Sequence, residues 1–201
     1  MMKKIGTPVP MYAVARWTIT LPEAEGSLGF DLEKLDWVTP HGAGVVSDLV
    51  FKQEKKIDNV LGSSATLRIG FSNPADGLIP LYELRDAESE LKLPRTAPPE
   101  GYEAERRLET NWTASREHTP LAKPALGYLY RVRTVLDESG RVKSAWYGKI
   151  DGEFDWDPRN FPTGQITFTY YLNPDGTPNL EFDRKKNLFG EMPVENTVRR
   201  P

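Results

Sequence analysis

The chain has 201 residues, of which 38% are hydrophobic and 27% are charged, and it contains no cysteine. Its 26 lysines and arginines nearly balance its 29 aspartates and glutamates, and the formal charge of −3 gives no reason to expect a nucleic acid or an anionic membrane as a partner. The lack of cysteine in the sequence excludes disulfides, thiolate zinc sites and a cysteine nucleophile.

A chain of this length suits one large domain, and we expect residues 1–201 to form a single β domain. No segment approaches the roughly 20 apolar residues that cross a membrane as a helix. Lys3 and Lys4 are not followed by the apolar stretch of a signal peptide. The sequence therefore predicts a soluble protein, without fixing its compartment or oligomeric state.

Alternation of apolar and polar residues predicts strands in the first half of the chain. Residues 12–21 and 65–71 each place their large apolar side chains at every second position, on one face of a strand. In residues 12–21 that face consists of Ala13, Ala15, Trp17, Ile19 and Leu21. Residues 44–52 are apolar but irregular, and we expect a central or bulged strand there.

Asp137-Glu-Ser-Gly140 predicts a hairpin whose loop is closed by a left-handed glycine. That loop fixes a register in which the cross-strand pairs are Leu136 with Val142, Thr134 with Ser144, Val132 with Trp146, and Tyr130 with Gly148. Most of the bulky even-numbered residues then face the core, and Ile150, Phe154 and Trp156 continue that face beyond a bend at Gly152.

Asn173-Pro-Asp-Gly176 has the composition of a second turn, with Gly176 in the left-handed conformation. It predicts another hairpin, in which Tyr170 pairs with Leu180 and Phe168 with Phe182.

Two further segments differ in composition from the predicted strands. Residues 85–127 are polar and rich in proline, which indicates a long insertion with a short helix near residues 102–108. Residues 184–201 form a basic C-terminal tail. The pattern as a whole predicts an all-β fold, an antiparallel two-sheet sandwich, with a partly closed, lipocalin-like barrel as the alternative.

Asp151, Glu153, Asp155 and Asp157 alternate along the last strand of the first hairpin. Residues two apart on a strand share a face and lie about 7 Å apart, so these four carboxylates are predicted to face the same way. They are the candidate metal ligands, and calcium is the candidate cofactor. The alternatives are a solvated outer face, balanced by Lys149 and other basic residues of the hairpin, and a glycosidase-like carboxylate pair.

Aromatic residues outside the clear alternation are candidates for ligand binding. Trp37, Trp112 and Tyr171 are expected at strand ends, in loops or at outward positions, where a ring face can stack on a sugar. The competing interpretation places such rings in the core. The two histidines, His41 and His118, lie in loop-like surroundings, and the sequence contains no zinc-protease, serine-hydrolase or phosphate-loop motif, so no catalytic residue is predicted.

Three segments carry a resemblance to known sequences. They are Tyr130–Ile150 (YRVRTVLDESGRVKSAWYGKI), Phe168–Pro174 (FTYYLNP) and Asn179–Asp183 (NLEFD). Together they resemble a group of uncharacterised, β-rich bacterial proteins. The compact Asp175-Gly176 replaces a longer loop in that group, and the resemblance implies no activity, cofactor or site.

These observations favour a non-enzymatic binding module, with carbohydrate or another surface polymer as its ligand. The first alternative is a structural or assembly subunit that uses residues 85–127 and the tail as arms toward a protein partner. A lipocalin-like carrier of a small apolar ligand is the second alternative, and an enzyme comes last.

Overall fold

The computed structural model describes residues 7–23, 26–58, 62–83, 93–112, 118–120, 123–159 and 163–199, and in these ranges the chain is all-β, without a helix. Nothing in the described ranges is a helix of the length and apolarity that a membrane span requires. The strands are β1 (Val9–Thr20), β2 (Leu28–Asp31), β3 (Asp36–Trp37), β4 (Leu49–Lys56), β5 (Ser63–Gly70), β6 (Gly77–Leu81), β7 (Glu105–Trp112), β8 (His118–Pro120), β9 (Gly127–Leu136), β10 (Val142–Asp157), β11 (Gln165–Asn173) and β12 (Phe182–Asn187).

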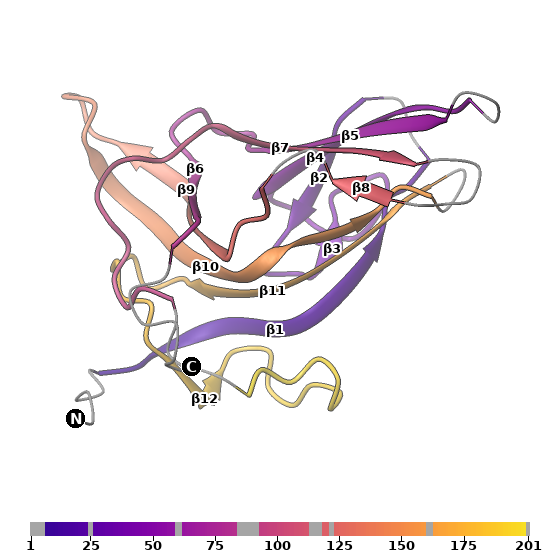
Figure 1. The fold of residues 1–201 in the computed structure, drawn as a ribbon. Coiled ribbons are helices and arrows are strands. Elements are labelled where there is room, and N and C mark those ends of the chain that lie inside the picture. Colours follow the sequence, from indigo (N-terminus) through magenta and orange to yellow (C-terminus); the bar gives the residue numbers. More distant parts are fainter. Residues whose placement is uncertain are drawn as a thin grey trace.

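The strands form two sheets that face each other as an open sandwich, which confirms the predicted fold class (Figure 1). Sheet 1 has the order β12-β1-β11-β10-β9-β6, and sheet 2 has the order β3-β2-β4-β5-β7-β8. Neighbouring strands are antiparallel, except that β12 runs parallel to β1. The sheets do not close into the barrel that was the alternative.

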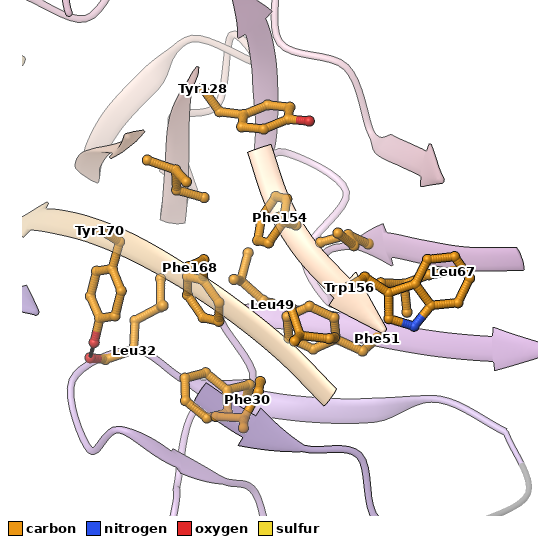
Figure 2. Packing of buried hydrophobic residues seen from close by; sticks show 14 of the residues in the cluster. Phe30, Leu32, Leu49, Phe51, Leu67, Tyr128, Phe154, Trp156, Phe168 and Tyr170 are labelled. Atoms are coloured by element: carbon orange, nitrogen blue, oxygen red, sulfur yellow. Dashed lines mark hydrogen bonds between the residues drawn. The ribbon is translucent and has the colours of Figure 1, made fainter. Parts of the chain in front are cut away.

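Aromatic side chains from both sheets fill the space between them (Figure 2). Phe154 and Phe168 of sheet 1 have ring centroids 5.4 Å apart, and both rings pack on Phe51 of sheet 2. Leu67 and Ile69 of β5 are fully buried in the same cluster, as the alternation predicts. Burial of aromatic and aliphatic area is the main force that holds two such sheets together.

The predicted hairpin of β9 and β10 is confirmed over most of its length. Gly140 has φ +79°, and the amide of Asp137 donates to the carbonyl of Arg141 at 2.8 Å. The pairs Leu136–Val142, Val132–Trp146 and Tyr130–Gly148 form as expected. Ser144, however, pairs with Val135 instead of Thr134, because a bulge at Arg133, whose φ is +55°, shifts the register locally.

A second bulge makes the prediction for β1 wrong in part. The register with β11 shifts between Val14 and Trp17, and Arg16 has φ +47°. Before the bulge, Val14 faces the space between the sheets, and after it Ile19 does so. Ala13 therefore lies on the opposite face of sheet 1 from Ile19, because one extra residue reverses the alternation.

The predicted second hairpin is wrong, although Gly176 does adopt φ +82°. Tyr170 pairs with Val14 on one side and with Ile150 on the other, so both edges of β11 are occupied by β1 and β10. The chain after Gly176 therefore has no edge of β11 to pair with. It crosses the outer face of sheet 1, and β12 adds to the far side of β1.

Residues 85–127 contain two strands of sheet 2, and the helix expected near residues 102–108 is a wrong prediction. Glu105–Trp112 is β7, which pairs with β5 so that Leu108 lies opposite Leu67. Its inward positions include Arg106 and Thr110, so the apolar alternation is too weak to reveal the strand. Within the basic tail, Val198 is buried and the Asn196 side chain donates to the carbonyl of Ala15.

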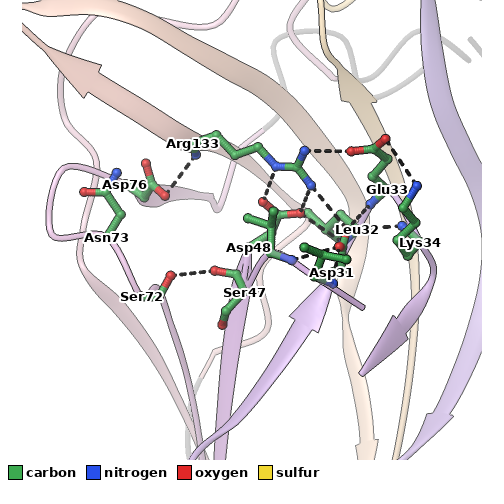
Figure 3. A network of polar contacts seen from close by, with 12 residues as sticks. Asp31, Leu32, Glu33, Lys34, Ser47, Asp48, Ser72, Asn73, Asp76 and Arg133 are labelled. Carbon is green, nitrogen blue, oxygen red and sulfur yellow. Dashed lines mark hydrogen bonds and ion pairs between the residues drawn. The ribbon is translucent and has the colours of Figure 1, made fainter. Parts of the chain in front are cut away.

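Arg133 joins the two sheets by a network of charges (Figure 3). Its backbone belongs to β9, and its guanidinium donates from Nε and Nη2 to both oxygens of Asp48, just before β4, at 2.8 and 3.0 Å. Nη1 donates to Glu33 at 2.7 Å and Nη2 to Asp31 of β2 at 3.2 Å. The guanidinium also lies 4.0 Å from the centre of the Trp146 ring.

The left-handed backbone at Arg133 and the carboxylates around it are held by further hydrogen bonds. Asp76, just before β6, accepts from the amides of Arg133 and Thr134 at 3.0 and 2.9 Å. Burial opposes ionisation of Asp31, but amides that include those of Val45 and Val46, together with Arg133, lower its pKa overall. Asp31 therefore remains a carboxylate beside the guanidinium.

We predict that Arg133→Met lowers the free energy of unfolding by about 3–5 kcal/mol, because it leaves buried carboxylates without their cation. Urea unfolding at pH 7 measures the change. Arg107→Met is the matched control, since Arg107 is half-exposed and pairs with the exposed side chain of Glu109 on the outer face of sheet 2, and it should cost within about 1 kcal/mol. Equal effects of the two variants would contradict a connecting role for Arg133.

Candidate functional site

The two candidate tryptophans belong to the main core instead of an open binding face. Trp37 is 7% exposed, its ring meets Phe30 edge-on at 5.4 Å, and its indole N–H donates to the carbonyl of Thr20. Trp112 packs against the same cluster at the end of β7 and is partly exposed. The structure therefore leaves Trp37 no free ring face on which a sugar can stack.

The four candidate calcium ligands do not come together. Gly152, with φ +87°, and a register shift between Asp151 and Asp155 interrupt the alternation on which that prediction depended. Asp157 forms an ion pair with Arg159 at 2.8 Å. Among the residues that the structure describes, no group of three acidic or histidine side chains is arranged to hold a metal ion.

Glu153 takes part in a different network, which links the two sheets next to the core. Its carboxylate accepts from the Tyr128 hydroxyl, from Arg106 of β7 at 3.0 Å and from the Ala125 amide at 2.8 Å. Arg106 also donates to the hydroxyls of Tyr128 and Tyr82, at 3.0 and 3.1 Å. Because these groups satisfy one another, we interpret this network as a connection between β7 and sheet 1.

Lys149 is the most unusual charged residue of the described chain. It lies on the outer face of β10, where it was expected to be solvated, yet it is only 4% exposed. Within the part of the chain that the structure describes, its ammonium makes no hydrogen bond and no ion pair, and it lies 4.7 Å from the centre of the Tyr171 ring. Burial lowers the pKa of Lys149 to about 8.

Tyr171, the third candidate ligand-binding aromatic, lies beside Lys149 because the two residues are direct partners in the pairing of β10 with β11. Its ring is 2% exposed and meets Phe182 edge-on at 5.3 Å. Tyr171 therefore presents a ring to Lys149 on the outer face of sheet 1, in a covered position.

A pair of extended segments, residues 95–97 and 178–181, covers this face, and we call it the clasp. The amide of Ala97 donates to the carbonyl of Pro178, and the amide of Leu180 donates to the carbonyl of Arg95, both at 2.8 Å. Ala97 and Leu180 are buried against Leu129, Ala145 and Tyr147 of sheet 1.

The fully buried Asn173 holds the clasp in place from β11. Its side-chain amide donates to the carbonyls of Thr177 and Asn179, each at 2.9 Å. The turn that the sequence suggested at residues 173–176 thus serves to lead the chain over sheet 1.

The clasp brings two more charged groups toward Lys149. Arg95 Nη1 lies 3.3 Å from Glu181 Oε1. The other oxygen, Glu181 Oε2, is buried and has no hydrogen-bond partner. Asp151 and Glu181 favour the charged form of Lys149, and Arg95 opposes it, but desolvation outweighs all three. Lys149, Tyr171, Glu181, Arg95 and Asp151 together form what we call the Lys149 site.

Sequence reasoning selected Tyr171 and Asp151 as candidate site residues, but it did not select Lys149, which lies beside both of them. The expected ionic face included Lys149, and nothing local marks that position as buried. The signal for its burial was in the neighbouring residues of the same face, because Leu129, Tyr147 and Tyr171 are large and also point outward. A row of such residues on an outer face indicates that another segment covers it.

Comparisons with protein-family models, with curated proteins and with solved structures found no match to this chain.

We predict that Lys149→Met raises the free energy of unfolding at pH 7 by roughly 2–3 kcal/mol, since it removes a buried charge whose pKa is depressed. The lysine is charged in both the folded and the unfolded states below pH 8. As the pH rises from about 8 to 10.5, the folded protein loses this proton first, and the penalty disappears. The advantage of the variant should shrink over that range.

Urea unfolding at pH 7, 8.5 and 10 measures this dependence. Lys143→Met changes an exposed lysine of the same strand, and its effect should not vary with pH. An advantage of Lys149→Met that stays constant from pH 7 to 10 would show that the ammonium is not desolvated.

Proposed function

We propose that the protein is a binding module for carbohydrate and that the Lys149 site holds one sugar unit. One observation carries the proposal. Glu181 Oε2 is a buried carboxylate oxygen without a hydrogen-bond partner, and within the described residues the ammonium of Lys149, a residue only 4% exposed, makes no hydrogen bond or ion pair. Buried polar atoms are nearly always paired, so an unpaired carboxylate oxygen in the same site as this ammonium favours a ligand that supplies both a donor and an acceptor.

The mixture of groups favours a sugar over an anion. Lys149 and Arg95 are donors, whereas Glu181 and Asp151 are acceptors that would repel a phosphate or a carboxylate. A sugar hydroxyl donates and accepts at once, so it can satisfy both kinds of group.

Access to the Lys149 site requires the clasp to move. That motion breaks two backbone hydrogen bonds between residues 95–97 and 178–180 and the two that Asn173 donates, and it exposes Ala97 and Leu180. Such local opening takes place at a free energy below that of global unfolding. The interior between the sheets is packed with aromatic rings, so the outer face is the more accessible place for a ligand.

The proposal is tested with an array of immobilised mono- and oligosaccharides. We expect retention of the wild-type protein on a subset of sugars. Both Lys149→Met and Glu181→Gln should weaken binding at least 10-fold, because each removes a polar group that the ligand pairs with. Lys143→Met and Trp37→Phe are controls that should leave retention unchanged. Failure to bind any sugar, or undiminished binding by Lys149→Met, would overturn the proposal.

A further inference from the structure

We propose that the outer face of sheet 2 binds the same face of a second copy of the protein, which gives a symmetric, salt-sensitive dimer. The observation that carries the proposal is a charge pattern on β4, β5 and β7, where a row of cations lies beside a row that contains carboxylates. A twofold rotation places each of these rows against the other. This surface is separate from the Lys149 site, which lies on sheet 1.

The three strands form an uninterrupted ladder, so their outward side chains line up in straight rows. β4 pairs with β5 over seven consecutive residues and β5 pairs with β7 over eight, and neither register shifts. Leu67 and Ile69 are buried on the inner face, so Thr66 and Arg68 point outward from β5. Residues that lie opposite one another on neighbouring strands share a face, and the pairing therefore defines the rows.

Two neighbouring rows carry most of the charge on this face. The cation row consists of Lys52, Arg68 and Arg107. The acidic row lies two residues further along the strands, about 7 Å away, and consists of Glu54, Thr66 and Glu109. The five charged side chains of the two rows are 39–55% exposed, so no described segment covers them.

Arg68 has the least favourable position of these charges in the monomer. It lies directly opposite a cation on each side, and like charges in that arrangement repel. Lys52 and Arg107 each lie close to a carboxylate of the acidic row, at 2.9 and 2.6 Å. Arg68 Nη1 lies 3.3 Å from Glu105, but its Nε is buried and has no hydrogen-bond partner within the described residues. Arg68 therefore gains most from carboxylates that a partner supplies.

A twofold axis parallel to the two rows and midway between them relates the copies. The rotation keeps each strand against its own counterpart and exchanges the rows, so the cation row of one copy lies on the acidic row of the other. Lys52 then meets the partner's Glu54, and Arg107 meets the partner's Glu109. Arg68 lies between these two carboxylates. An axis placed on either row would bring like charges together, which disfavours those two registers.

The rows on either side fit the same axis. Val50 and Glu105 belong to the row beyond the cations, and Lys56 and Asn111 to the row beyond the carboxylates. The rotation sets Glu105 against the partner's Asn111, whose amide can donate to it, and Val50 against the stem of the partner's Lys56. No like charges meet in these outer rows.

An interface made of exposed ion pairs is weak, because each pair contributes little. We expect a dissociation constant of about 100 µM, typical of a transient contact. The protein is then a monomer at the micromolar concentrations of the unfolding experiments. High salt screens the charges and should weaken the dimer further.

Sedimentation velocity of the full chain tests the proposal, at about 5 to about 500 µM protein and at about 0.02 and about 0.5 M NaCl. We expect a reversible dimer whose dissociation constant rises about 10-fold at the higher salt. Arg68→Glu should raise it about 10-fold at low salt, because the new carboxylate lies between the partner's Glu54 and Glu109. A monomer at all concentrations, or a dimer that Arg68→Glu leaves unchanged, would overturn the proposal.

A matched control and a rescue make the test specific for this register. Lys143→Glu makes the same kind of charge reversal on the exposed hairpin of sheet 1, and it should leave the dissociation constant unchanged. The double variant Thr66→Lys/Arg68→Glu sets each new lysine against the partner's new carboxylate, so it should restore the wild-type dissociation constant or lower it. Thermal unfolding checks that each variant is folded. A folded double variant that stays monomeric would contradict the register and overturn the proposal.

Discussion

The guanidinium of Arg133 is the polar interaction on which the arrangement of the two sheets depends. Hydrophobic burial brings sheets together without fixing their relative position, because it is not directional. Arg133 adds direction, since it binds Asp48 through two donors and reaches Asp31 and Glu33 from β9. The left-handed backbone that aims it is in turn held by Asp76.

The same strands present a different chemistry on the outer face of sheet 1. There one oxygen of Glu181 pairs with Arg95 and the other has no hydrogen-bond partner, unlike the carboxylates around Arg133 and Arg106. The clasp, which carries Glu181 and follows a strand with no free edge, covers the face on which Lys149 lies. The sandwich thus carries on its outer face a small covered site, and its cover is held by two backbone hydrogen bonds, by Asn173 and by the burial of Ala97 and Leu180.

Local patterns predicted the site only in part. Tyr171 was selected as an outward aromatic ring that could bind a ligand, and Asp151 as one of a row of four candidate metal ligands. Both residues lie beside Lys149. Trp37 failed as a candidate because the rings of Phe30 and Phe51 enclose it. The row of carboxylates failed as a metal site because the bulge at Gly152 divides it. Burial by a distant segment has no local signature, and for that reason Lys149 was missed.

The sequence by itself determined the all-β class, the hairpin closed by Gly140 and the inward face that runs from Val132 to Trp156. These are properties of neighbouring residues, since the period of a strand and the left-handed glycine act over a few positions. Only the tertiary structure decided the bulges at Arg16 and Arg133, the parallel pairing of β12 and the cover over Lys149. Each depends on which segments, far apart in the chain, compete for the same strand edge or sheet face.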